Sequence, residues 1–151
     1  METKVNVRIK RGIEEVLLSH GYLCEIQSSN IILVGLKNIE AKLIIIEQEG
    51  KIYFQLDVLS IEELTESNEL YKDLLHLNYD IVPLSIAIDK SEENDHVLIL
   101  TTALEAENLD ENELIKIVHS FEEAIEDLIM LLKNYFIDGL ELREGEISGL
   151  Y

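Results

Sequence analysis

The sequence predicts an α+β fold in which helices pack on one antiparallel sheet, in the order helix, strands, helix, two strands, helix. Three observations support this class. Short segments rich in Ile, Leu, Val and aromatic residues alternate with turn sequences in the first half. A second pair of such segments surrounds a polar turn later in the chain. A long apolar stripe with helical spacing then runs up to Gly139.

The N-terminal segment fits two patterns. Val5, Val7 and Ile9 alternate as in a strand, but a longer helical face extends to Leu17, with Gly21 as its stop. The longer pattern favours a helix, and we leave helix or strand open for residues 4–10. The helical face comprises Val5, Ile9, Ile13, Val16 and Leu17.

Four strands are expected next, separated by hairpin turns at residues 27–30 and at Glu49-Gly50. In the last of them apolar and polar residues alternate, as in an antiparallel strand with one face in water. The expected strands are Tyr22–Ile26, Ile31–Gly35, Ala41–Glu47 and Ile52–Leu59.

A second helical stretch is expected from Ser60 to about Leu77, because Ser60 and Glu63 have the spacing of a capping box. Ser67-Asn68 is the point at which it could divide in two. Pro83 ends any helix and starts an extended run. The buried side is expected to hold Ile61, Leu64, Leu70, Leu74 and Leu77, and a hairpin should follow at Leu84–Ile88 and Val97–Ala103.

The last helix has the strongest pattern and is expected over Glu111–Asp138. Asp110 and Glu113 form a capping box, and Gly139 stops the helix. We therefore expect one domain over residues 1–139, followed by an acidic and apolar tail at 140–151. The stripe repeats at Leu114, Val118, Phe121, Ile125, Leu128, Leu132 and Tyr135.

Charge divides the chain unevenly. Residues 1–60 hold seven basic and eight acidic residues, a net charge of −1, whereas residues 61–151 hold five and 23, a net charge of −18. The pI near 4.4 argues against nucleic acid and anionic membranes as partners. One cysteine and no apolar run of ~20 residues predict a cytoplasmic protein without membrane insertion.

Candidate chemical sites are weak. His20 and Cys24 are four residues apart with Gly21 between them, and zinc needs three or four ligands. Carboxylates crowd the turn from Asp89 to Asp95, yet the spacing of a calcium-binding loop is absent. His119 has the helical spacing of a local pair with Glu123. We therefore expect no metal, no cofactor and no catalytic residue.

Binding residues are expected on the last helix. Its solvent-exposed face carries adjacent acids that would attract a basic partner, and its apolar stripe is wider than one sheet face requires. The expected partner-binding residues are Glu122, Glu123, Glu126 and Asp127. The expected homodimer interface is Ile125, Ile129, Leu132 and Phe136, the alternative being that the whole stripe packs inside one subunit.

One group of short motifs lies between residues 70 and 136: Leu74-Leu75, Val82-Pro83-Leu84-Ser85-Ile86, Thr101-Thr102-Ala103-Leu104, Ile117-Val118-His119, Glu122-Glu123 and Leu128. On these residues the stretch resembles the YbjN / type III secretion chaperone-like superfamily, especially its YjfI-like branch. The resemblance implies this fold, frequent dimers and binding of protein segments rather than catalysis. It also associates the branch with coiled-coil stress proteins of the phage-shock type.

We therefore expect a homodimeric, non-catalytic chaperone or adaptor whose protein partner carries a basic segment. The alternative is a small metal- or ligand-binding enzyme that uses the Asp89–Asp95 turn or His119.

Overall fold

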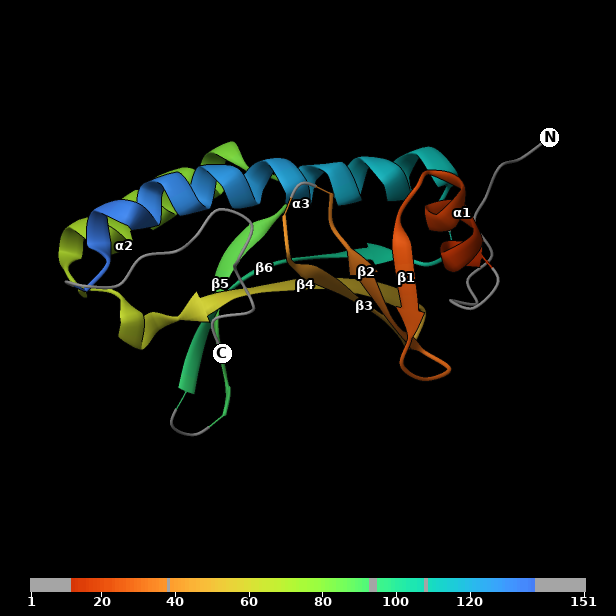
Figure 1. Cartoon of the computed structure of the whole chain (residues 1–151), viewed down its shortest axis with the longest axis horizontal. Coiled ribbons are helices and arrows are strands. Elements are labelled where there is room, and N and C mark those ends of the chain that lie inside the picture. Colours follow the sequence, from red (N-terminus) through yellow and green to blue (C-terminus); the bar gives the residue numbers. More distant parts are fainter. Residues whose placement is uncertain (1–11, 38, 93–94, 108, 138–151) are drawn as a thin grey trace.

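The computed structural model describes residues 12–37, 39–92, 95–107 and 109–137. They form a six-stranded antiparallel sheet with α-helices packed on one side (Figure 1). The predicted α+β class is confirmed, together with its order of elements. Residues 4–10 and the tail at 140–151 lie outside the described residues, so the division into a domain and a tail stays a prediction.

The first half follows the predicted strands within one or two residues. Gly21 has φ of +86° and stops the first helix, while Gly50, at +79°, turns the chain between the third and fourth strands. These elements are α1 (Glu14–Ser19), β1 (Leu23–Ile26), β2 (Ile31–Gly35), β3 (Lys42–Gln48) and β4 (Lys51–Ser60).

The predicted helix from Ser60 to Leu77 is wrong in its first part. Ser60 accepts a hydrogen bond from the Glu62 amide and caps only a single 3-10 turn, η2 (Ile61–Glu63). The chain then extends, and α2 (Asn68–Asp80) begins where Ser67 Oγ accepts from the Leu70 amide at 3.1 Å. Ser67 is therefore the true cap of this helix.

The last helix ends earlier than expected. The structure has α3 (Glu111–Leu132) and a short 3-10 turn, η3 (Lys133–Tyr135), instead of a helix to Asp138. Phe136 is extended and forms an antiparallel bridge with Leu64. The Thr65 amide donates to the Tyr135 carbonyl at 2.6 Å, so pairing with the segment after η2 competes with further helix.

The sheet has the order β1-β2-β3-β4-β6-β5, with β5 (Ser85–Glu92) and β6 (Asp95–Glu105) forming the second hairpin. α3 lies across one side of all these strands, while α1 and α2 flank it at opposite ends (Figure 1). The rings of Phe54 on β4 and Phe121 on α3 have centroids 6.3 Å apart in the core between them. The other side of β1–β3 has no described helix over it.

Candidate protein-binding surfaces

The acidic residues predicted to bind a partner divide into two kinds. Glu122 is half-buried, and its two carboxylate oxygens accept hydrogen bonds from the Tyr22 hydroxyl at 2.8 Å and the Lys37 amide at 2.6 Å. This carboxylate therefore joins α3 to the residue that precedes β1 and to the turn after β2. Glu123, Glu126 and Asp127 are exposed.

Two of these exposed acids line a hollow of about 220 Å³ between α3 and the end of α2. Glu123 and Asp127 come from α3, and Asp80 comes from the last residue of α2. Ala124 and Ile81 contribute apolar surface to the same hollow. Three carboxylates around a shallow hollow suit an ammonium or guanidinium group, which is the chemistry expected of a basic partner.

The residues predicted for the dimer interface lie largely inside the subunit. Ile125 and Leu132 are fully buried in the core, and Ile129 and Phe136 are half-buried and packed against it. The wide stripe of α3 is thus used within one chain, because it covers a sheet several strands wide. The homodimer and its predicted interface stay predictions, and within that interface only the exposed parts of Ile129 and Phe136 are available to a second copy.

α2 presents an exposed apolar stripe that our sequence analysis missed. Leu75 is 68% exposed, Tyr79 is 85% exposed and Val82 is 72% exposed, with Tyr71 one turn before them. The spacing of four residues from Tyr71 to Leu75 to Tyr79 puts all three on one face of the helix. The signal was present in the sequence, but Leu70, Leu74 and Leu77 were the residues expected to be buried there. We call Tyr71, Leu75, Tyr79 and Val82 the α2 stripe.

A groove of about 290 Å³ separates α2 from the edge strand β5 beside this stripe. Asn78 fixes its width, because its side-chain oxygen accepts from the Ile86 amide at 2.5 Å and its amide group donates to the Ile86 carbonyl at 3.5 Å. The remaining lining is apolar and includes Leu75 and Ile88. The α2 stripe and the groove form one continuous apolar surface.

The sheet side opposite α3 is also apolar at one end. The register places Leu33 opposite Ile44, and it places Ile31, Ile46 and Tyr53 in one row across β2, β3 and β4. Tyr53 is exposed and the other four are half-buried, without packing against the core. We call Ile31, Leu33, Ile44, Ile46 and Tyr53 the open sheet face.

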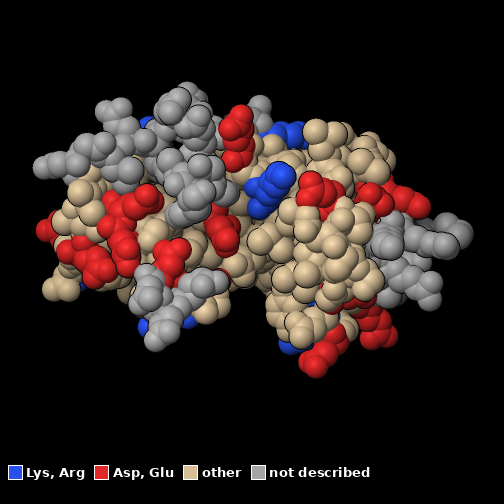
Figure 2. Space-filling model, turned by 60° about the horizontal axis from the view of Figure 1, so that its bottom comes forward, with Lys and Arg blue, Asp and Glu red and all other residues tan. Residues whose placement is uncertain are grey.

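Charged and uncharged areas are unevenly distributed on the side of the molecule opposite α3. Figure 2, in which the lower side of Figure 1 comes forward, shows acids at both ends, including a group toward the end that carries α2 and the β5–β6 hairpin. The end that carries β1–β3 presents a broad area with few charged residues. The two ends therefore offer a partner different chemistry.

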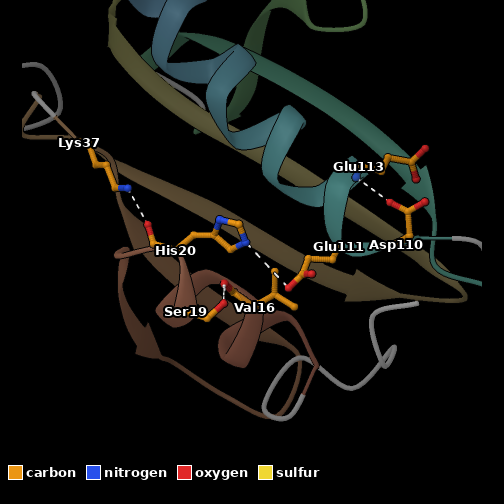
Figure 3. A network of polar contacts seen from close by, with 7 residues as sticks. All are labelled: Val16, Ser19, His20, Lys37, Asp110, Glu111 and Glu113. Atoms are coloured by element: carbon orange, nitrogen blue, oxygen red, sulfur yellow. Dashed lines mark hydrogen bonds and ion pairs between the residues drawn. The ribbon is translucent and has the colours of Figure 1, made fainter. Parts of the chain in front are cut away.

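His20 takes part in a local polar network rather than a metal site. Its Nε2 lies 3.9 Å from the Glu111 carboxylate, and its carbonyl accepts from Lys37 Nζ at 2.6 Å (Figure 3). Within the described residues, no three potential ligands among His, Cys, Asp and Glu side chains lie together as a metal would require. His119 is exposed, and its ring centroid lies 6.5 Å from that of Tyr22.

The remaining chemical candidates have local roles. Burial, with a smaller contribution from Glu14, raises the pKa of the Cys24 thiol to about 11, so little nucleophilic thiolate forms at neutral pH. The Ser91 amide donates to Asp89 at 2.9 Å and lowers the pKa of that carboxyl. Such a bond is typical of a turn. In the described parts of the chain, no helix combines the length and the apolar character needed to span a membrane.

A sheet with helices on one side and exposed apolar surfaces elsewhere defines a small chaperone-like protein-binding module. The chain belongs to the CesT_Tir_1 family, whose model matches residues 10–137. This confirms the resemblance to the type III secretion chaperone-like superfamily and supports a non-catalytic role in binding proteins. No curated protein gives a significant match to the sequence.

Solved structures agree with this fold. YbjN from E. coli superposes with a TM-score of 0.58 at 16% identity, covering 89% of this chain and 99% of its own. The heterodimeric ExoU-SpcU complex from the type III secretion system of Pseudomonas aeruginosa gives 0.60 at 19%, covering 81% and 98%. An uncharacterised protein from Methanothermobacter thermautotrophicus gives 0.59 at 12%, covering 81% and 94%. At these identities the likeness shows the fold alone.

Proposed function

We propose that this protein is a homodimeric, non-catalytic chaperone or adaptor that holds a basic, partly apolar segment of another protein. The observation that carries the homodimer is the α2 stripe, whose large apolar side chains are exposed. Exposed apolar surface that continues into a groove is typical of an interaction site. Family membership supports the class of function, and the stripe offers a surface for a second copy of the chain.

A second copy of the chain is the proposed occupant of the α2 stripe and its groove. Each chain carries a net charge of −19, so two copies repel one another wherever acids face acids. Its helical residues, Tyr71, Leu75 and Tyr79, are uncharged over about two helical turns, and the stripe lies beside an apolar groove. A two-fold axis next to α2 would place each Leu75 against the partner's groove, since such interfaces use the same patch twice.

The test replaces Leu75 with Glu and compares it with Met130→Glu on α3. Both native residues are exposed, at 68% and 67%, so neither change should unfold the subunit. An unpaired carboxylate in the interface should cost about 3 kcal/mol, or roughly 100-fold in Kd. Light scattering should show monomers for Leu75→Glu and dimers for Met130→Glu. A wild type that is monomeric at high micromolar concentration would contradict the homodimer.

The basic segment is proposed from the hollow formed by Asp80, Glu123 and Asp127, with Glu126 nearby in sequence on the same helix. Exposed charges change association rates more than they change affinity. A variant with Glu123→Gln, Glu126→Gln and Asp127→Asn should therefore bind its partner more slowly at low salt, with little change in dissociation. Glu122 is left intact, because it joins α3 to the residue that precedes β1.

The partner is identified first, by pull-down from a lysate of the source organism with wild type as bait. The resemblance to the YjfI-like branch directs attention to coiled-coil stress proteins of the phage-shock type. Surface-plasmon kinetics then compare wild type with the triple variant, with Glu113→Gln as a matched control at the far end of α3. An unchanged association rate at low salt would remove the acidic hollow from the mechanism.

A further inference from the structure

We propose that the open sheet face is a second binding surface, whose occupant is an amphipathic helix of the partner with an apolar stripe and basic flanks. This inference rests on the proposed function and names where the partner segment sits. The first observation is in the strands themselves. Residues 31–34 and 43–46 are unbroken apolar runs, which is the pattern of strands covered on both sides.

The structure covers only one of those sides. Ile32, Val34, Leu43 and Ile45 face the core and are fully buried. Their neighbours on the opposite side remain half-buried and outside the core, and no described helix lies over them. A strand of an open antiparallel sheet would normally carry polar residues at these outward positions. The side of β2 and β3 opposite α3 therefore has the composition of a surface that another element covers.

The dimensions suit one helix. Neighbouring strands lie ~4.8 Å apart, so the apolar row from Ile31 through Ile46 to Tyr53 spans roughly 10 Å. That is about the diameter of an α-helix. α3 already covers the opposite side of these strands, so an added helix would complete a helix–sheet–helix sandwich.

The charged residues on this side of the sheet indicate which residues should flank the apolar stripe of the partner helix. Register places four acids and two lysines on this side of the sheet, and the Glu25 carboxylate forms an ion pair with Lys42 Nζ at 4.0 Å across β2. Asp57 and Asp89 lie near Gln55, beside the apolar rows. Basic residues on the helix would meet these carboxylates while its apolar stripe covers Leu33 and Ile44. The charged residues on this side are Glu25, Lys42, Lys51, Asp57, Asp89 and Glu105.

The test uses a fluorescein-labelled synthetic peptide of 18 residues, with Leu at helical spacing along one face and Lys elsewhere. A scrambled peptide of the same composition has no apolar face. Fluorescence anisotropy should show wild type binding the striped peptide at least ~10-fold more tightly than the scrambled one. A peptide with Glu in place of Lys should bind at least ~10-fold more weakly than the striped Lys peptide, because acids would face acids.

A double variant, Leu33→Thr with Ile44→Thr, removes the centre of the open sheet face while keeping residues that favour strands. It should lose the preference for the striped peptide. The matched control, Leu18→Thr on α1 with Met130→Thr on α3, removes exposed apolar residues outside both proposed surfaces and should keep that preference. Circular dichroism and thermal melting establish that both variants are folded.

Several results would overturn the proposal. Equal binding of the striped and scrambled peptides would do so, as would full binding by the Leu33→Thr/Ile44→Thr variant. If that variant were monomeric while Leu75→Glu stayed dimeric, the open sheet face would belong to a second copy. If the partner from the pull-down still bound the variant normally, the module would retain its proposed function, and only this site would be wrong.

Discussion

The helices α2 and α3 are both amphipathic, yet they use their apolar sides differently. α3 buries nine residues, from Leu114 to Leu132, whereas α2 buries only Leu70 and Leu74. α3 crosses the sheet and buries its apolar stripe against the strands. α2 lies at one end of the sheet and contacts mainly β5 and α3. In this protein the helix with the wider apolar stripe, α3, covers more of the sheet. The helix with the narrower buried side, α2, is the one that leaves apolar side chains exposed.

The largest expected effect is on the free energy of unfolding, which should depend strongly on a leucine of α3 and hardly at all on a leucine of α2. Leu128→Ala on α3 should lower the free energy of unfolding by about 2–5 kcal/mol, because it opens a cavity at a fully buried site. Leu75→Ala on α2 should change the unfolding of the monomer by less than ~0.5 kcal/mol. Urea unfolding at a concentration where light scattering shows monomers measures both. Similar losses for the two variants would break the comparison.

A smaller effect should appear within α3. Glu122→Ala leaves the Tyr22 hydroxyl and the Lys37 amide without their acceptor and should cost about 1–3 kcal/mol. Glu126→Ala, at an exposed position four residues on, should be close to neutral. Combining Glu122→Ala with Tyr22→Phe should cost less than the sum of the two single changes, because both remove the same bond. If the two losses of unfolding free energy simply added, the hydrogen bond between Tyr22 and Glu122 would contribute nothing to stability.

The smallest effect concerns Glu63, beside the bridge that ends α3. Burial, and then the nearby charge of Asp95, raise the pKa of the Glu63 carboxyl, and its Oε2 is buried without a hydrogen bond. Between the ordinary and the raised pKa the folded state holds more protons than the unfolded state, so stability falls as pH rises through that window. Glu63→Gln should thus raise the melting temperature at pH 7 and leave it unchanged below pH ~4.

Melting curves of wild type and Glu63→Gln across this pH range check the prediction. Glu62→Gln is the matched control, since the neighbouring residue is exposed. A gain at pH 7 that persists unchanged at low pH would attribute the effect to packing of the amide rather than to the charge of Glu63.

Much of the fold followed from short-range pattern. Alternation and turn residues located all six strands, and the spacing of Asp110 and Glu113 located the start of α3, where Asp110 Oδ1 accepts from the Glu113 amide at 2.7 Å. These features depend on neighbours in sequence, so the sequence contains them. The two boundary errors, at Ser60 and at Phe136, have one cause: the segments after η2 and after α3 pair with each other, although more than 70 residues separate Leu64 from Phe136.

The sequence by itself determined which residues are apolar, where the helices and strands lie, and that the surface is acidic. The tertiary structure decided which apolar residues remain uncovered. Ile125 and Leu75 both lie on amphipathic helices, but Ile125 is fully buried in the core, whereas Leu75 stays 68% exposed. Likewise Glu122 and Glu126 are equivalent in pattern, and only the fold brings Tyr22 and Lys37 to one of them. Burial and pairing are properties of contacts between segments distant in sequence, which local spacing cannot encode.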